Sequence, residues 1–141
     1  MFNKIFLSSD HGGFELKEKI KSFLIDNNFE YEDLGCSSLK PVDYPDFAKL
    51  LSNKIKDKNN SKGIIFCGTG IGISIAANRF PHIRAALCTS VEMASKSRKH
   101  NDANVLALGG RILEDKLALE IVKEFLQTEF EAGRHSLRVN K

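Results

Sequence analysis

Apolar residues along this chain fall into two alternating patterns. Five short runs are rich in β-branched, aromatic and leucine residues, which suits buried strands, and stretches with helical periodicity separate them. The runs predict strands at residues 4–8, 31–34, 64–66, 84–88 and 105–108. In the first helical stretch, residues 14–27, the apolar side chains that share one face are Leu16, Ile20, Phe23 and Leu24. This alternation predicts right-handed βαβ units, and therefore a three-layer, Rossmann-like α/β fold with a five-stranded parallel sheet covered by helices on both faces.

Capping and helix-breaking residues mark the ends of the other helices. Asp46 is expected to cap a second helix, whose apolar positions would be Phe47, Leu50, Leu51 and Ile55. Further helices are predicted at residues 74–80, 91–99 and 114–130, the last being the longest. Gly133 follows it, and residues 131–141 are expected to form a basic tail. Because no repeat or linker interrupts the sequence, we expect one domain over residues 1–141.

The glycine-rich segment after the third strand carries the most chemistry. The strand ends in Cys67, and Gly68, Gly70 and Gly72 then lead into a helix. Glycines at a helix start leave backbone N–H groups accessible, so the loop is expected to bind an anion, and a phosphate is the first candidate. A thiol near a helix N-terminus is in a setting that favours the thiolate. The alternative is a turn chosen for tight strand–helix packing, with Cys67 an inert buried residue.

Two familiar glycine motifs are excluded. A Walker loop requires a Lys followed by Ser or Thr, and no such pair follows Gly72. The G-x-G-x-G spacing also differs from the G-x-G-x-x-G of dinucleotide-binding proteins, and no acidic residue ends the next strand, residues 84–88. The ligand is therefore not expected to be a nucleotide.

Charge and composition exclude further classes. The net charge of +3 is spread along the chain, and the lysine-rich segment 54–62 is expected to be a solvated helix end and loop, so nucleic acid is not an expected partner. No apolar run is long enough to span a membrane, and residue 4 already begins a strand, so we expect no membrane segment and a cytoplasmic location. The three cysteines, Cys36, Cys67 and Cys88, lack C-x-x-C spacing, which argues against a disulfide framework and a zinc site.

Other polar residues follow the predicted strands. Asp10 and His11 come after the first strand and Arg111 after the fifth, and the carboxyl ends of parallel strands share one edge. Each polar residue also has an ordinary explanation, since Asp10 could cap a helix and His100 could offset a helix dipole. Likewise, Asn101 could simply end a helix and Tyr44 could pack in a turn. Arg134 and Arg138 could be solvated residues of the tail. Their combination with a candidate thiolate instead predicts that these groups gather at one edge of the sheet.

Five motifs resemble those of the type B ribose-5-phosphate isomerases, a family that also holds the galactose-6-phosphate isomerase subunits. The motifs lie at residues 9–14 (Ser-Asp-His-Gly-Gly-Phe), 43–45 (Asp-Tyr-Pro), 67–78, 97–107 and 133–138, in order along nearly the whole chain. The resemblance implies interconversion of ribose 5-phosphate and ribulose 5-phosphate, a reaction of the pentose phosphate pathway. It also implies a homodimer or dimer of dimers with shared active sites, and neither a metal nor an organic cofactor.

The resemblance further implies a role for each matched residue. Cys67 matches the base that moves a proton between C2 and C1 through a cis-enediolate, His100 the group that opens the sugar ring, and Asp10 a residue that hydrogen-bonds the sugar. On this resemblance, the glycine loop would bind the enediolate oxygen instead of the phosphate expected above. The anion hole would consist of Gly68, Thr69, Gly70, Ile71 and Gly72. The remaining substrate-binding residues would be His11, Arg134 and Arg138 at the phosphate, Tyr44 in its matching motif, and Asn101 and Arg111 from the neighbouring subunit.

Other functions stay open on the sequence. A relative acting on galactose 6-phosphate or allose 6-phosphate would use the same reaction on a longer sugar. A non-catalytic sugar-phosphate sensor would tolerate loss of the thiol. A receiver-like signalling domain would need clustered acidic residues after the first strand and a phosphorylatable Asp in place of Cys67.

Overall fold

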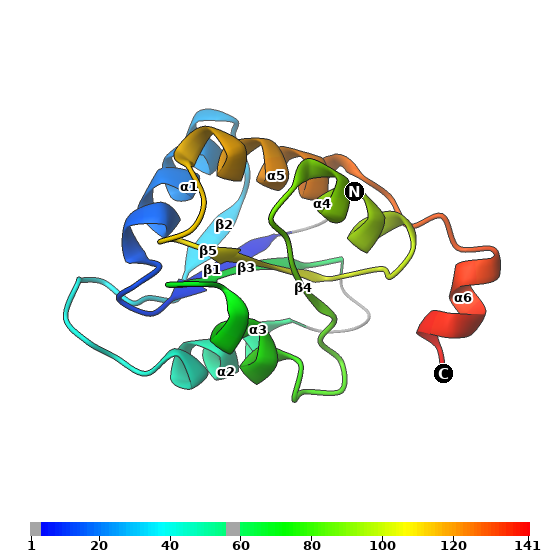
Figure 1. Ribbon diagram of the computed structural model, residues 1–141, viewed down its shortest axis with the longest axis horizontal. Helices are drawn as coiled ribbons and strands as arrows, with labels where there is room; N and C mark the ends of the chain where they lie inside the picture. The colour runs from blue at the N-terminus through cyan, green and yellow to red at the C-terminus, as the bar shows by residue number, and fades with distance from the viewer. Residues whose placement is uncertain (1–3, 56–59) are drawn as a thin grey trace.

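The computed structural model describes residues 4–55 and 60–141, which form a five-stranded sheet flanked by helices (Figure 1). The strands are β1 (Ile5–Ser9), β2 (Tyr31–Asp33), β3 (Lys62–Cys67), β4 (Ala85–Leu87) and β5 (Val105–Gly109). The helices are α1 (Phe14–Asp26), α2 (Tyr44–Lys54), α3 (Ile71–Ala77), α4 (Val91–Lys99), α5 (Asp115–Gln127) and α6 (Arg134–Val139). The strands pair in parallel in the order β2-β1-β3-β5-β4, which confirms the predicted fold class.

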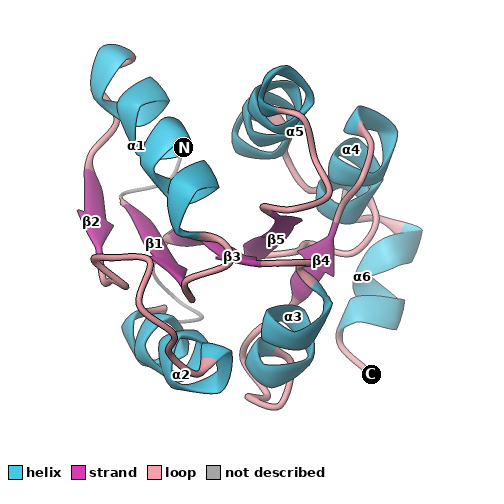
Figure 2. Ribbon diagram, turned by 60° about the vertical axis from the view of Figure 1, so that its left-hand side comes forward, coloured by secondary structure: helices cyan, strands magenta, loops and turns pink. Residues whose placement is uncertain are grey.

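Helices cover both faces of the sheet, with α1, α4 and α5 on one face and α2 and α3 on the other (Figure 2). Alternate side chains of β3 point into the two cores, because successive residues of a strand face opposite sides. Ile64 and Phe66 pack in the core beneath α1, α4 and α5, whereas Ile65 and Cys67 pack beneath α2 and α3. The strand thus places the Cys67 side chain on the α2–α3 side of the sheet. No helix in the described ranges has the length and apolar character needed to cross a membrane.

The start of α2 differs from the prediction. The helix begins at Tyr44, with Asp43 at the N-cap position and Pro45 in the first turn, so the expected cap at Asp46 is wrong. Proline favours this position because the first turn needs no N–H donor there. Leu50, predicted to face inward, is 47% exposed. The buried residues of α2 are instead Ala48, Leu51 and Ser52, and Ile55, directly after the helix, is buried with them.

The chain after α5 also differs from the prediction. Residues 134–139 form the short helix α6 rather than an extended tail. Helix α5 ends at Gln127 and has 13 residues, the same length as α1. The prediction that it is the longest helix is therefore wrong. In the expected solvated segment 54–62, residues 56–59 lie outside the described part of the chain, and Lys62 opens β3 with its side chain buried.

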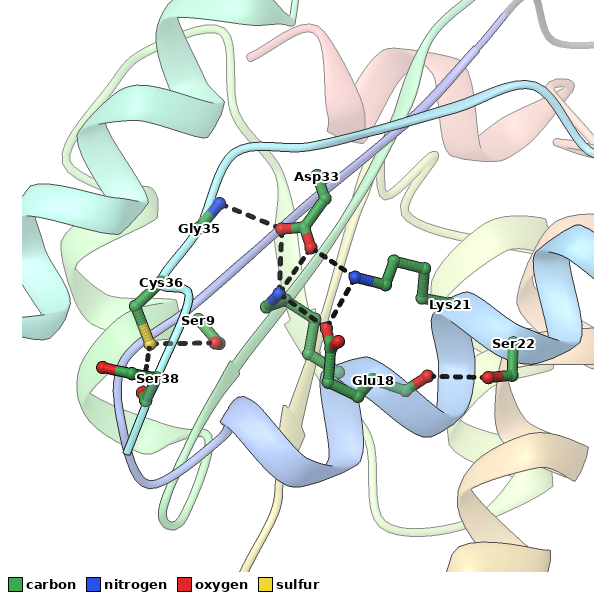
Figure 3. A network of polar contacts seen from close by, with 9 residues as sticks. Ser9, Glu18, Lys21, Ser22, Asp33, Gly35, Cys36 and Ser38 are labelled. Carbon is green, nitrogen blue, oxygen red and sulfur yellow. Dashed lines mark hydrogen bonds and ion pairs between the residues drawn. The ribbon is translucent and has the colours of Figure 1, made fainter. Parts of the chain in front are cut away.

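A buried ion network joins the edge strand β2 to α1 (Figure 3). The Lys17 side chain is fully buried, and its Nζ lies 2.7 Å and 2.8 Å from the carboxylate oxygens of Asp33. Lys21 and the Gly35 N–H also donate to Asp33. Burial raises the pKa of Asp33, but the hydrogen bonds from Lys17, Gly35 and Lys21 outweigh it, and the pKa is lowered below its ordinary value. The carboxylate therefore stays charged and holds β2 in place.

Candidate active site

The glycine loop folds tightly around the thiol of Cys67. The Cys67 side chain is 4% exposed, and its Sγ accepts the N–H of Gly70 at 3.1 Å. Gly70 has a φ of +80°, and a Cβ there would lie 2.6 Å from Leu87, so only glycine fits this turn. Ile71 donates its N–H to Thr69 Oγ1 at 3.2 Å. Two of the donors expected to face an anion, the N–H groups of Gly70 and Ile71, are thus hydrogen-bonded within the loop.

The loop after β1 touches the glycine loop. A Cβ on Gly12 would lie 3.0 Å from the Gly68 nitrogen, so the two backbones are in close contact. The buried Asp10 accepts the Gly13 N–H through Oδ1 at 3.1 Å in the turn before α1, whose N-cap residue is Gly13 itself, so Asp10 does not cap the helix. His11 accepts the Val42 N–H at Nδ1, 3.1 Å away. Because a backbone N–H can only donate, Nδ1 carries no proton and Nε2 is the donor that His11 offers to a ligand.

Arg111 belongs to the same group of residues. Its side-chain atoms lie 3.4 Å from the positions that a Cβ would take on Gly12 and on Gly68 of the same chain. Its N–H also donates to the Gly68 carbonyl at 2.9 Å. The guanidinium of Arg111 thus lies beside its own chain's glycine loop, a position that favours a role in this chain's site over the expected role in the neighbouring subunit's site.

Tyr44 completes this part of the site. A Cβ on Gly72 would lie 2.8 Å from the Tyr44 ring, so the ring rests directly on the glycine loop. We name the residues that meet here the carboxyl-edge cluster, because they gather where β1, β3 and β5 end. They are Asp10, His11, Tyr44, Cys67, Thr69 and Arg111, with the glycines of residues 68–72.

The other predicted residues lie at the opposite edge of the sheet. Helix α4 runs back along the sheet, so His100, just after its last residue, lies near the start of β5. His100, Asn101, His135 and Arg138 line a cavity of about 630 Å³ beside β4, which Ala85 and Ala86 of that strand also line. With Arg134, the first residue of α6, and Glu131, they form what we call the amino-edge cluster.

One chain does not bring the two clusters together. In the pairing of β3 with β5, Gly63 lies opposite Val105 at the amino edge, and Cys67 lies opposite Gly109 at the carboxyl edge. Four residues at ~3.3 Å each separate the two edges by about 13 Å along the strands alone. The expectation that His100 and the late arginines share one sheet edge with Cys67 is therefore wrong. The reason is that a helix in a βαβ unit returns its C-terminal end to the amino edge.

The remaining cysteines lie outside the glycine loop. Burial raises the pKa of the Cys88 thiol to about 11, although a hydrogen bond with Ser97 opposes this. Such a thiol stays protonated and unreactive near neutral pH. Cys36 is also buried, with its Sγ 3.7 Å from Ser9 Oγ. Cys67 is thus the cysteine whose surroundings suit chemistry.

One set of side chains in the described ranges has the composition of a metal site, namely His100, Glu131 and His135. Glu131 Oε1 lies 4.0 Å from His100 Nε2 and 3.7 Å from His135 Nε2. Tetrahedral zinc with bonds of about 2.0–2.1 Å needs ligand atoms about 3.3 Å apart, with the ion in the plane of each imidazole. The two rings instead stack at 4.2 Å with planes 15° apart, so their lone pairs cannot converge on one ion. This geometry does not fit a metal.

Sequence reasoning did not single out Glu131 and His135. His135 lies between Arg134 and Arg138 in a segment interpreted as a solvated tail, yet the residue is buried. The available signal was Gly133, because glycine readily adopts a positive φ. In the structure Gly133 has a φ of +54° and is the N-cap residue of α6.

A thiol beside backbone donors, a buried carboxylate and several arginines at the ends of a parallel sheet fit an α/β protein that acts on a small anionic substrate. The sequence profile described as Ribose/Galactose Isomerase matches residues 5–141. The chain therefore belongs to the ribose/galactose isomerase family.

Relatives and solved structures agree with this assignment. The chain is 44% identical to a putative sugar phosphate isomerase of Rickettsia conorii, over 97% of this chain and 95% of that protein. It is 43% identical to ribose-5-phosphate isomerase B of Escherichia coli K12, over 96% of this chain and 91% of that protein. The structure of ribose-5-phosphate isomerase B from Clostridium thermocellum matches with a TM-score of 0.94 and 50% identity, covering 98% of this chain and 93% of that one. The Mycoplasma genitalium enzyme, with ribulose-5-phosphate bound, matches with a TM-score of 0.93 and 41% identity, covering 97% and 91%.

Proposed function

We propose that this protein interconverts D-ribose 5-phosphate and D-ribulose 5-phosphate, as an aldose–ketose isomerase of the pentose phosphate pathway. The observation that carries the proposal is the carboxyl-edge cluster. There the Cys67 thiol accepts the Gly70 N–H, and the glycine loop also contacts Arg111 and the loop after β1 that contains Asp10. The family assignment supports it, because relatives over nearly the whole chain bear this activity in their names and one holds ribulose-5-phosphate.

In the proposed reaction Cys67 acts as the base. Its thiolate removes the proton from C2 of the open-chain aldose, and the electron pair moves to the carbonyl oxygen O1, which gives a cis-enediolate. The hydroxyl proton then passes from O2 to O1, and the Cys67 thiol returns a proton to C1, which forms the ketose. The Thr69 hydroxyl and the backbone donors of residues 68–72 other than the N–H groups of Gly70 and Ile71, which are bonded within the loop, would stabilise the enediolate oxygen, and Asp10 would hydrogen-bond the nearby hydroxyls.

We further propose that each active site joins the carboxyl-edge cluster of one chain to the amino-edge cluster of a second copy. His11 and Arg111 would bind the sugar phosphate from the first chain, and Arg134 and Arg138 from the second. His100 and Asn101 of the second chain would reach the sugar, with His100 opening its ring. The separation of the two clusters along the sheet supports this arrangement, because neither cluster alone contains all the groups. A dianionic phosphate held away from the reacting carbons then lets binding energy orient them.

The six-carbon sugars galactose 6-phosphate and allose 6-phosphate are the alternative substrates, because the family description covers both ribose and galactose isomerases. The test is turnover by the purified protein on all three sugar phosphates, each with and without a chelator. Conversion of ribose 5-phosphate that exceeds conversion of both hexose phosphates by at least about tenfold in kcat/KM supports the proposal. A preference for a hexose phosphate would move the assignment to that sugar. Binding of all three without turnover would identify a sensor.

A further inference from the structure

Two stacked histidines form the centre of the amino-edge cluster. The imidazoles of His100 and His135 have centroids 4.2 Å apart and planes within 15° of parallel. The His135 side chain is 9% exposed, whereas the His100 side chain is 31% exposed beside the cavity next to β4. The buried ring is thus a flat surface against which the exposed ring rests.

The Glu131 carboxylate lies near the Nε2 atoms of both imidazoles. Its Oε1 is 3.7 Å from His135 Nε2 and 4.0 Å from His100 Nε2, distances at which the interaction is electrostatic rather than a hydrogen bond. The pKa of His135 is lowered below its ordinary value, chiefly by burial and then by the nearby His100, Arg134 and Arg138. The negative charge of Glu131 opposes this shift. The lowered pKa favours the neutral form of His135, which leaves the carboxylate available to the His100 imidazole.

The backbone that carries Glu131 is tied to the end of α4. The Glu131 N–H donates to the Lys99 carbonyl at 3.1 Å. The buried Arg98 donates to the carbonyls of Thr128 at 3.0 Å and Ala103 at 2.6 Å. These bonds fix the segment after α5 against the residues on both sides of His100. The carboxylate thus approaches His100 from a rigid part of the fold.

We propose that His135 and Glu131 are positioning residues for ring opening by His100, an inference that rests on the proposed isomerase function. In ring opening the C1–O4 bond of the furanose breaks and the C1=O1 carbonyl forms. His100 takes the proton from the O1 hydroxyl and supplies a proton to O4, so it passes through its cationic form. His135 fixes the plane of the His100 ring by stacking, and Glu131 stabilises the transient cation.

Four variants separate these roles. His135→Ala removes the stacked ring, His135→Phe keeps a flat ring, Glu131→Gln removes the charge and keeps the shape, and Glu129→Gln alters an exposed carboxylate two positions away. For ribose 5-phosphate we expect His135→Ala and Glu131→Gln to lower kcat at least about fivefold, and His135→Phe to recover to within about twofold of the native value. For ribulose 5-phosphate, which needs no ring opening, kcat should stay within about twofold in every variant. The comparison uses kcat because the equilibrium constant fixes the ratio of the two kcat/KM values.

A measurement without substrate reports the geometry directly. Stacked rings shift each other's proton resonances upfield, so the His100 ring protons should move downfield in His135→Ala and stay near their native positions in His135→Phe and Glu129→Gln. Native-like circular dichroism would confirm that each variant is folded, and a variant that fails this check is replaced by His135→Leu. The proposal is overturned if the stacking shift disappears in a folded variant while kcat from ribose 5-phosphate stays native. It is also overturned if both directions fall equally. If His100→Asn itself leaves kcat in both directions native, the ring-opening role of His100 in the proposed function fails instead.

Discussion

The proposed division of the site between the two sheet edges of two chains predicts which inactive variants can restore one another. Cys67→Ala damages the carboxyl-edge cluster, and the double variant Arg134→Ala/Arg138→Ala damages the amino-edge cluster. If a site takes one cluster from each chain, a hybrid dimer of these two variants has one site with both defects and one with none. Random exchange of equal amounts makes half of the dimers hybrid. The mixture should therefore regain about a quarter of native activity per subunit.

The background of the parent variants must lie well below that value. A hydrogen bond between a charged donor and an anion contributes about 1.5–3 kcal/mol, so loss of two arginine contacts to the phosphate costs about 3–6 kcal/mol. At 1.36 kcal/mol per factor of ten, kcat/KM should fall by about 10²–10⁴. Residual activity of about 1% or less is readily distinguished from a regained quarter.

Arg111 supplies the matched control for this experiment. Because its side chain lies beside Gly68 of its own chain, Cys67→Ala and Arg111→Ala damage the same cluster. Each site of their hybrid dimer carries one defect, and mixing should restore nothing. Exchange is verified with mass-tagged subunits, and activity is measured as ribose 5-phosphate turnover before and after mixing. The reasoning is refuted if verified hybrids of Cys67→Ala with Arg134→Ala/Arg138→Ala stay inactive, or if those with Arg111→Ala recover.

Three further predictions concern single residues. Cys67→Ala should abolish isomerisation while substrate affinity, measured by calorimetry, stays within about tenfold, and Cys36→Ala should keep native turnover; more than a few per cent activity in Cys67→Ala would contradict its role as the base. In His100→Asn the rate from ribose 5-phosphate should level off with rising enzyme concentration at the sugar's spontaneous ring-opening rate, whereas a rate that rises linearly, as for the native enzyme, would count against ring opening. Asp33→Asn should lower the free energy of unfolding in urea by about 2–4 kcal/mol, because it removes the carboxylate closest to the buried Lys17 and leaves only the partly exposed Glu18 to pair with it. Because the pKa of Asp33 is lowered in the folded state, its stabilisation should be present above its ordinary value of 3.8 and lost as the pH falls below it, and a stability profile unchanged by the mutation would refute this.

Periodicity predicted the sheet and the carboxyl-edge cluster because both depend on local pattern and on one rule about parallel strands. Asp10 and Arg111 follow strands and Cys67 ends one, so their meeting at one edge could be predicted from the order of elements. His100 was placed at the same edge for its chemistry alone. It follows a helix, and the direction of that helix puts it at the other edge.

The errors at α2 and α6 have a different origin. In α2 the buried stripe runs through Ala48 and Ser52, two small residues that a count of large apolar side chains overlooks, and it leaves Leu50 exposed. In α6 a single short helix has no repeating apolar face, and its buried residue His135 stacks on His100 at the end of α4. Tertiary contacts decide both cases, and they are not encoded in any short stretch of sequence.

The placement of the two proposed proton-transfer groups explains why a pair of chains would serve the proposed reaction. Cys67, at 4% exposure, sits at a strand end where glycines bring the backbone close to the sulfur. His100 sits at a helix end beside a cavity, where a cyclic sugar could reach it. A parallel sheet places these two kinds of ends at opposite edges, so no single copy can offer both to one substrate. A two-fold axis perpendicular to the strands sets two sheets antiparallel and brings the carboxyl edge of each level with the amino edge of the other. Such an axis would create two equal sites from one interface, which is the arrangement that the proposed function requires.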